Sequence, residues 1–117
     1  MLMNKNLKII ELVDNSEDSE TIYCMEENGY MYATISFEKS SESMYIYNVC
    51  VKEENRNNKL GTWLIHYLEN IGIRYNKKFS ALTALKDKEW LINWYKKLGY
   101  SIYSNDDKYF YMIKYLK

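Results

Sequence analysis

The pattern of residues 44–71 constrains the fold more than any other part of this 117-residue chain. Apolar residues occupy both alternating faces of 44–51, interrupted only by Asn48, which predicts a central strand of a sheet covered on both sides. After a polar connection over 52–59, apolar residues recur with the three-and-four spacing of one amphipathic helix. That stripe consists of Leu60, Trp63, Leu64, Tyr67, Leu68 and Ile71, and Gly72 is the expected cap at its C-terminal end.

Strand-like segments dominate the rest of the chain. Asn28-Gly29 separates two segments rich in β-branched and aromatic residues, and this pair predicts a hairpin because it tolerates positive φ at both central turn positions. Strands are expected at 7–13, 21–27, 30–37, 79–85, 100–104 and 108–116, and 14–20 is expected to be a loop or at most two helical turns.

A second helix is predicted between Asp87, as its N-terminal cap, and Gly99, where a left-handed residue ends it. Its apolar stripe is Leu91, Trp94, Tyr95 and Leu98. The predicted order is strand, hairpin, strand, helix, strand, helix, hairpin. We therefore expect one α/β (α+β) domain over 1–117, with antiparallel pairs outnumbering parallel ones.

Composition excludes several classes of protein. Sixteen basic and sixteen acidic residues give zero net charge, which argues against a dedicated nucleic-acid binder. No apolar segment is long enough to span a membrane and no signal-peptide core appears, so we expect a cytoplasmic protein. Cys24 and Cys50 lie in strand-like segments without metal-ligand spacing, and His66 has no ligand partner nearby, so buried free thiols and no metal are expected.

The junction between the central strand and the first helix has the form of an anion site. The first N–H groups of a helix have no acceptor within it and lie at the positive end of its dipole, so a pyrophosphate can accept several of them. Gly61 lets the backbone approach phosphate oxygens, while Arg56 and Lys59 add positive charge. The alternative is an ordinary loop with solvated charges.

Two motifs resemble those of the Gcn5-related N-acetyltransferases (GNAT). The family signature for acetyl-CoA is Arg or Gln, two residues, Gly, one residue, then Gly or Ala, between a central strand and a helix. Arg56 and Gly61 match it, with Lys59 where the first glycine usually stands. The run from Tyr95 to Tyr100 is similar to the Tyr-x-x-x-Gly-Phe ending of the family's next helix.

The resemblance implies a GNAT-like mixed, mostly antiparallel sheet flanked by helices, with acetyl-CoA as co-substrate. Main-chain groups of Val49 and Val51 would hold the pantetheine arm, and Tyr95 would protonate the departing sulfur. The pyrophosphate would be bound around the helix start by Arg56, Asn57, Asn58, Lys59, Leu60, Gly61 and Thr62. The alternative for Tyr95 is a core tyrosine, one of thirteen in the chain.

The acceptor and the general base are not identified by the sequence. Glu53 and Glu54 follow the strand end but fit solvated loop charges equally well, and many relatives use a water chain. Relatives usually insert two helices between their first two strands, whereas only 14–20 are available here, so this helix pair is reduced or absent and the acceptor groove is shallow or completed by another subunit.

Three hypotheses follow. The chain is an N-acetyltransferase that moves the acetyl group of acetyl-CoA to a primary amine of a small molecule or protein. Alternatively, it is a non-catalytic acyl-CoA-binding module, or an interaction protein without a CoA site. The oligomeric state stays open, with a homodimer paired through the tyrosine-rich last strand as one alternative.

Overall fold

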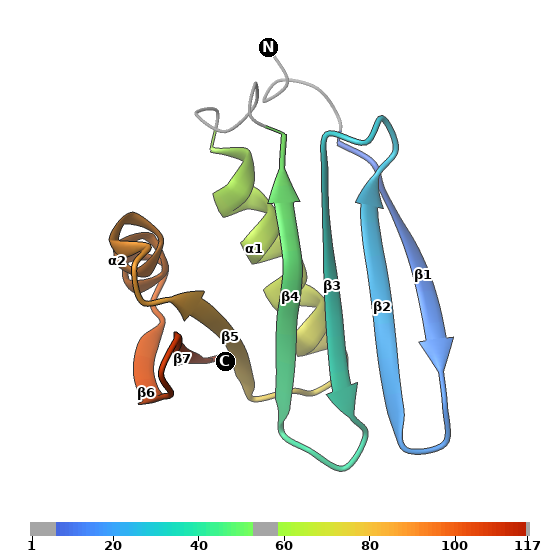
Figure 1. Cartoon of the computed structure of the whole chain (residues 1–117). Helices are drawn as coiled ribbons and strands as arrows, with labels where there is room; N and C mark the ends of the chain where they lie inside the picture. The colour runs from blue at the N-terminus through green and yellow to red at the C-terminus, as the bar shows by residue number, and fades with distance from the viewer. Residues whose placement is uncertain (1–6, 53–58, 117) are drawn as a thin grey trace.

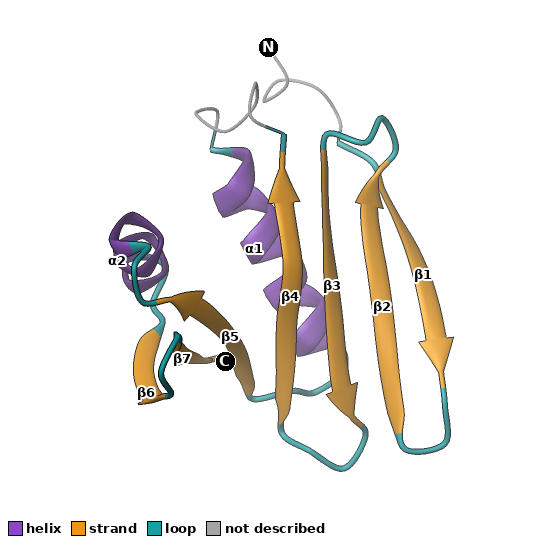
Figure 2. Cartoon of the chain, in the orientation of Figure 1, coloured by secondary structure: helices purple, strands orange, loops and turns teal. Residues whose placement is uncertain are grey.

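The computed structural model describes residues 7–52 and 59–116, and within them the chain forms one mixed sheet with two helices (Figures 1 and 2). The sheet has the order β1-β2-β3-β4-β5-β7-β6, and every neighbouring pair is antiparallel except β4 and β5. The elements are β1 (Ile9–Asn15), β2 (Ser19–Glu26), β3 (Met31–Glu38), β4 (Ser43–Val51), α1 (Leu60–Arg74), β5 (Phe79–Leu85), α2 (Glu89–Lys97), β6 (Ser101–Asn105) and β7 (Tyr109–Tyr115). The predicted α+β class and element order are confirmed.

The N-terminal helix pair is absent from the described residues. β1 and β2 are joined by a tight turn in which the Ser16 N–H donates to the Ser19 carbonyl at 2.9 Å. Of the two alternatives expected for 14–20, the structure has the loop, confined to 16–18, and no helical turn, because Asp14 pairs with Thr21 and Glu20 with Asn15 in the hairpin. The polar segment is simply too short to do more than close a hairpin.

β4 is central in the sheet, but only one of its faces is covered. Met44 and Ile46 point into the core beneath α1, whereas Tyr45 and Tyr47 on the opposite face are 49% and 41% exposed. Figure 1 shows α1 behind β3 and β4, with no described helix in front of them. The prediction of a strand buried on both faces is therefore wrong. Tyrosine supports either environment, because its ring packs while its hydroxyl reaches water.

The β2–β3 hairpin forms where Asn28-Gly29 predicts it, with a different turn. Only Gly29 has positive φ, at 77°, so Asn28 does not adopt the expected mirror-image turn conformation. The connection is four residues long and is organised by the buried carboxylate of Glu26, which accepts the N–H groups of Asn28 at 2.8 Å and Tyr30 at 3.2 Å. A charged acceptor beneath the turn thus selects its geometry.

Two predicted helix caps are wrong. Gly72 lies inside α1, which continues to Arg74, and a Cβ at Gly72 would overlap the Met44 sulfur. The glycine is needed for close packing on β4, and the left-handed residue after α1 is Asn76. The N-cap of α2 is Lys88 rather than Asp87, and it caps without a side-chain hydrogen bond. Gly99, at φ 104°, ends α2 as predicted.

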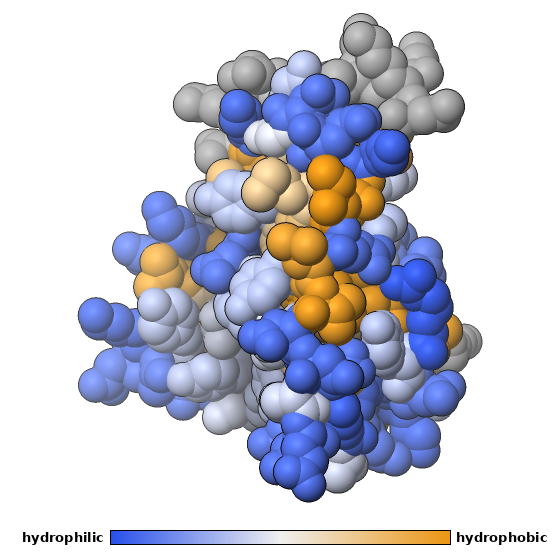
Figure 3. Space-filling view, turned by 90° about the vertical axis from the view of Figure 1, so that its right-hand side faces the viewer, coloured by the Kyte–Doolittle hydropathy of each residue, from blue (hydrophilic) through white to orange (hydrophobic). Residues whose placement is uncertain are grey.

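The last strand is not available for pairing with a second copy. β7 lies between β5 and β6, so the edges of the sheet are β1 and β6, and the argument for a dimer through the last strand is wrong. At the β1 edge, Ile10, Leu12 and Val13 are about half exposed or more. Figure 3, seen from this side, shows apolar side chains gathered there.

The two cysteines differ in environment, which makes them a test of the packing. Cys24 is buried, and burial raises the pKa of its thiol to about 12, while Cys50 is half-buried. A raised thiol pKa leaves almost no thiolate at pH 8, and the thiolate is the reactive form. We expect Ellman's reagent at pH 8 to titrate Cys50 alone in the native protein and both thiols in denaturant. Rapid labelling of native Cys50→Ser would contradict the described burial of Cys24.

Candidate functional site

The main feature of the candidate site is a slot between β4 and β5. These strands pair only over Ser43–Phe79, Met44–Ser80 and Tyr45–Ala81, and beyond Tyr45 they diverge. The V-shaped opening is visible in Figure 1, where β5 turns away from β4 as both leave the bottom of the sheet. Divergence exposes the β5-facing edge of β4 in the middle of the molecule, where a sheet is normally continuous.

A β-bulge changes the direction of β4 beside this slot. Ala33 of β3 opposes two residues of β4, Asn48 and Val49, because the register shifts between Tyr32 and Thr34. Asn48 has φ 56°, a left-handed conformation that asparagine adopts more readily than most residues. The polar interruption of the apolar strand therefore marks the bulge, a feature that the sequence pattern alone did not identify.

The bulge also sets which main-chain groups face the slot. The Lys52 N–H donates to the Tyr30 carbonyl of β3 at 2.9 Å. Main-chain groups alternate between the two sides of a strand, so those of Val49 and Val51 point toward β5. Both residues predicted to hold a pantetheine arm thus lie with their main chain on the slot side of β4.

Helix α1 begins beside the open end of the slot. Its N-cap, Lys59, makes no side-chain capping bond, and its first turn contains no acidic residue, so the positive end of the helix dipole is not neutralised by these side chains. Lys59 has φ 62°, the left-handed region that favours glycine, which accounts physically for a glycine at this position in the family signature. Leu60, Gly61 and Thr62 supply the first helical N–H groups. Arg56, Asn57 and Asn58 lie outside the described residues, as do Glu53 and Glu54.

Gly61 has a structural role in addition to the predicted one. A Cβ at this position would lie 3.3 Å from two atoms of the Trp94 ring and 4.0 Å from Val51 Cγ2. The Trp94 Nε1–H also donates to Thr62 Oγ1 at 3.3 Å. The Trp94 ring thus fills the space that a side chain at position 61 would take. This contact packs α2 against the start of α1, at the end of β4.

Tyr95, the predicted proton donor, is 6% exposed and belongs to the single hydrophobic core. Its ring lies 5.3 Å from that of Trp94 and 6.0 Å from that of Tyr100. Burial raises the pKa of its hydroxyl, which therefore keeps its proton throughout the physiological pH range. Within the described residues the Tyr95 hydroxyl makes no hydrogen bond.

A buried polar cluster, missed by the sequence analysis, supports α2 from below. The Tyr100 hydroxyl lies 2.7 Å from Ser80 Oγ and donates to Glu69 Oε2 at 2.9 Å, and Lys114 Nζ pairs with Glu69 Oε1 at 3.1 Å. Glu69 is only 6% exposed. The available signal was an acidic residue directly after Leu68, at the border of the apolar stripe. The cluster links α1, β5 and β7 to Tyr100, which lies between α2 and β6.

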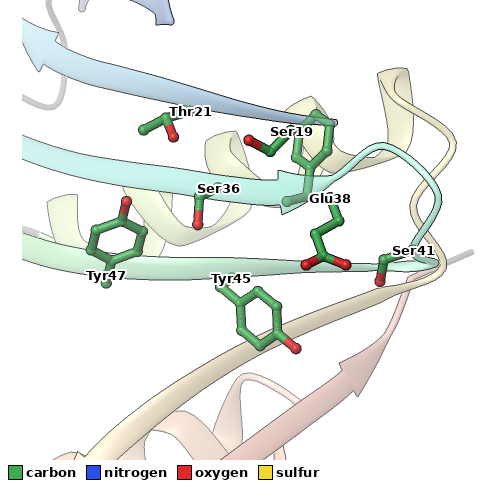
Figure 4. A pocket seen from close by; sticks show the side chains of 8 residues that line it. Ser19, Thr21, Ser36, Glu38, Ser41, Tyr45 and Tyr47 are labelled. Atoms are coloured by element: carbon green, nitrogen blue, oxygen red, sulfur yellow. The ribbon is translucent and has the colours of Figure 1, made fainter. Parts of the chain in front are cut away.

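On the sheet face away from α1 lies a polar hollow of about 450 Å³. Strand register places Thr21, Ser36 and Tyr45 side by side across β2, β3 and β4, and Tyr47 lies next along β4. Glu38 supplies the only charged side chain among the residues that line it (Figure 4). None of these residues was singled out by the sequence analysis.

The comparisons with known proteins agree with this geometry. The model of the acetyltransferase (GNAT) domain matches residues 18–102, so the chain belongs to this family. Its fold is similar to that of IAA acetyltransferase from Bacillus cereus, with TM-score 0.74 and 13% identity over 95% of this chain and 100% of that one. It is also similar to PaiA N-acetyltransferase from Thermoplasma acidophilum in complex with coenzyme A, with TM-score 0.71 and 16% identity over 84% and 61%.

A third similar structure is the ribosomal-protein-S18-alanine N-acetyltransferase of Escherichia coli, with TM-score 0.70 and 13% identity over 88% and 72% of the two chains. At such identities the likeness shows the fold. A search of curated proteins finds no match. Neither described helix has the length and apolar character to cross a bilayer, and the described residues contain no group of three potential metal ligands.

Proposed function

We propose that the chain transfers the acetyl group of acetyl-CoA to a primary amine of a small molecule or protein. The observation that carries the proposal is the slot between β4 and β5, which opens beside the start of α1. An extended pantetheine arm can take the place of a missing neighbouring strand along β4, since strand edges bind extended chains through main-chain hydrogen bonds. The cytoplasmic location remains a prediction.

In this proposal the main-chain groups of Val49 and Val51 hold the pantetheine arm. The pyrophosphate is bound by the N–H groups of Leu60, Gly61 and Thr62, next to Lys59, because a helix N-terminus favours anions. Arg56, Asn57 and Asn58 complete the site as predicted from the family signature. The bound group is a co-substrate, so it leaves after each turnover as CoA.

Acetyl-CoA supplies the acetyl group as an activated thioester. A neutral amine nitrogen forms a bond to the acetyl carbon, and a main-chain N–H of β4 near the bulge donates to the oxyanion that develops. The carbon–sulfur bond then breaks, and the Tyr95 hydroxyl donates its proton to the departing sulfur. The amine loses one proton to solvent, directly or through a water chain, and the Tyr95 phenolate regains one proton from solvent, which restores the enzyme. The products are an amide and CoA.

The second candidate is an acyl-CoA-binding module without transferase activity. It is supported by the β1–β2 connection, a tight turn where relatives usually carry two helices that wall the acceptor groove. Such a module would keep the slot and the helix start but would not position an amine. Both candidates bind acyl-CoA, but only the first transfers the acyl group to an amine.

Acetyl-CoA binding can be tested by charge reversal at Lys59, which is exposed and has no capping bond. Both aspartate and asparagine tolerate its left-handed conformation and cap helices well, so Lys59→Asp and Lys59→Asn should fold with equal or higher stability. We expect acetyl-CoA at a hundred times its Kd to stabilise the wild-type protein by about 2.7 kcal/mol. We expect Lys59→Asp to bind it about tenfold more weakly, because a carboxylate then faces the pyrophosphate, with Lys59→Asn in between.

A thermal-shift titration with acetyl-CoA, followed by a transfer assay on a panel of amines and peptides, distinguishes the two candidates. No shift at millimolar acetyl-CoA would overturn both candidates and favour an interaction protein. A shift without transfer to any amine would favour the binding module. Equal affinity of Lys59→Asp and Lys59→Asn would remove the start of α1 from the pyrophosphate site.

A further inference from the structure

The polar hollow on the open face of the sheet is unusual in its lining. Six of its eight lining residues carry a hydroxyl group, namely Ser19, Thr21, Ser36, Ser41, Tyr45 and Tyr47. Its volume of about 450 Å³ falls within the range of small-molecule sites. A lining this polar suits a hydrophilic ligand rather than an apolar one.

Glu38 gives the hollow its charge. Figure 4 shows its carboxylate extending from β3 toward β4, between the side chains of Tyr45 and Ser41. Glu38 is exposed, and within the described residues its side chain makes no ion pair and no hydrogen bond. Its main-chain carbonyl accepts the Ser41 N–H at 3.1 Å and Lys77 Nζ at 3.0 Å. The Lys77 ammonium is also held by the Ser41 carbonyl at 2.6 Å and lies over the Phe37 ring, so this cation is already committed to the turn. The Glu38 carboxylate is therefore available to a cationic ligand.

The position of the hollow relates it to the slot. Tyr45 is the last residue of β4 that pairs with β5, so the hollow reaches the point where the slot begins. Tyr47 lines the hollow and directly precedes Asn48 at the bulge. A ligand in the hollow thus has one end beside the bulge of β4, where the proposed reaction takes place.

The distance between Glu38, at one end of the hollow, and Tyr47, at the other, limits the shape of the ligand. Tyr47 is paired with Thr34, and Glu38 lies four residues further along β3, which is roughly 13 Å at strand spacing. A compact amine cannot touch Glu38 and reach the bulge at once, whereas an extended molecule can. The hydroxyl groups between the two ends can solvate additional polar atoms.

From these observations we infer that the hollow binds the acceptor, and that the acceptor is a linear small molecule with at least two ammonium groups. One ammonium pairs with Glu38, while the other end lies near the bulge, where its neutral amine form attacks the acetyl group. This inference rests on the proposed function for the reaction, but the binding itself does not require turnover.

The test compares a diamine with a monoamine of the same length. The probes are 1,8-diaminooctane and octylamine, titrated by NMR into the full chain with and without CoA. The variant is Glu38→Gln, and the matched control is Glu42→Gln, which removes the same charge in the same β3–β4 turn from an exposed pair with Lys78. Glu42 does not line the hollow.

We expect the diamine to bind Glu38→Gln about fivefold to tenfold more weakly than the wild type, as is usual for the loss of a partly solvated charged contact. Glu42→Gln should match the wild type, and octylamine should not distinguish the three proteins. Shifted signals should come from Ser36, Tyr45 and Tyr47. Equal diamine affinity in Glu38→Gln and the wild type, or equal losses in both variants, would overturn the inference.

Failure of the proposed function gives a different pattern. If the protein binds no acetyl-CoA, the titration without CoA still reports whether Glu38 recognises the second ammonium. If diamines bind as expected but no amine of the panel is acetylated, the hollow stands as a binding site and the transferase proposal fails. If monoamines are acetylated as well as diamines, and Glu38→Gln changes neither, the transferase proposal stands and the assignment of the hollow fails.

Discussion

Replacing Tyr95 by phenylalanine is expected to lower kcat for acetyl transfer by about 10²-fold while leaving the KM for acetyl-CoA unchanged. The substitution removes only the hydroxyl, which is the group that donates a proton to the departing sulfur. The ring remains to pack against Trp94 and Tyr100 at 5.3 and 6.0 Å, so the melting temperature should change little. Steady-state kinetics with the best amine from the panel provides the measurement.

The pH profile separates proton donation from packing. Burial raises the pKa of Tyr95, so the wild-type enzyme should keep its acid form as pH rises and lose activity only above the ordinary tyrosine range. Tyr95→Phe should lack this alkaline limb. Tyr103→Phe, which removes a hydroxyl from an exposed tyrosine of β6, is the matched control and should behave as wild type. An unaltered kcat in Tyr95→Phe would show that this residue is a core tyrosine without a catalytic role.

The largest loss of stability is expected from Glu69→Ala. This change deletes the partner of Lys114 and one partner of the Tyr100 hydroxyl, and it leaves a cavity under α1. Breaking a buried ion pair from one side lowers the free energy of unfolding by about 3 kcal/mol. For a domain of this size that corresponds to a melting temperature lower by roughly 10 °C. Thermal and urea denaturation followed by circular dichroism would measure it.

Two further substitutions separate the contribution of the Glu69–Lys114 pair from that of the Tyr100 hydrogen bond. Glu69→Gln keeps a hydrogen-bond acceptor for Tyr100 and should lose less stability than Glu69→Ala. Tyr100→Phe leaves the Glu69–Lys114 pair intact and should also be milder. Asn70→Ala, at an exposed position of the same helix, should be neutral or slightly stabilising. A loss below about 1 kcal/mol in Glu69→Ala would mean that water replaces the deleted carboxylate.

The fold was predictable because its signals are local. The three-and-four spacing from Leu60 to Ile71 defined α1, and the bounds of β5 were predicted without error. Gly99 ended α2 because positive φ is a property of one residue and its neighbours. The family motifs added the order of the strands around the slot, which periodicity alone does not provide.

The errors concern properties that depend on distant parts of the chain. Tyr45 and Tyr47 are exposed because no element of the part of the chain that the structure describes covers this face of the sheet, and a strand pattern does not record that. Gly72 looked like a cap until its packing against Met44 was known. The carboxylate of Glu69 finds its partners on β7 and after α2, in Lys114 and Tyr100, and both contacts are non-local. The hollow was missed for the same reason, because its lining residues come from three strands and from the β3–β4 turn.

The three residue pairs that join β4 to β5 also have a mechanical consequence. Within the described residues they are the only strand ladder between a block of four strands and a block of three, and further contacts come from the N–H groups of Lys78 and Phe79, which donate to the Glu42 carbonyl, and from the shared core. We therefore expect ladder bonds on the two sides of the junction to open with different free energies in hydrogen exchange. A molecule bound along β4 would therefore add contacts between the two blocks of strands and couple their opening.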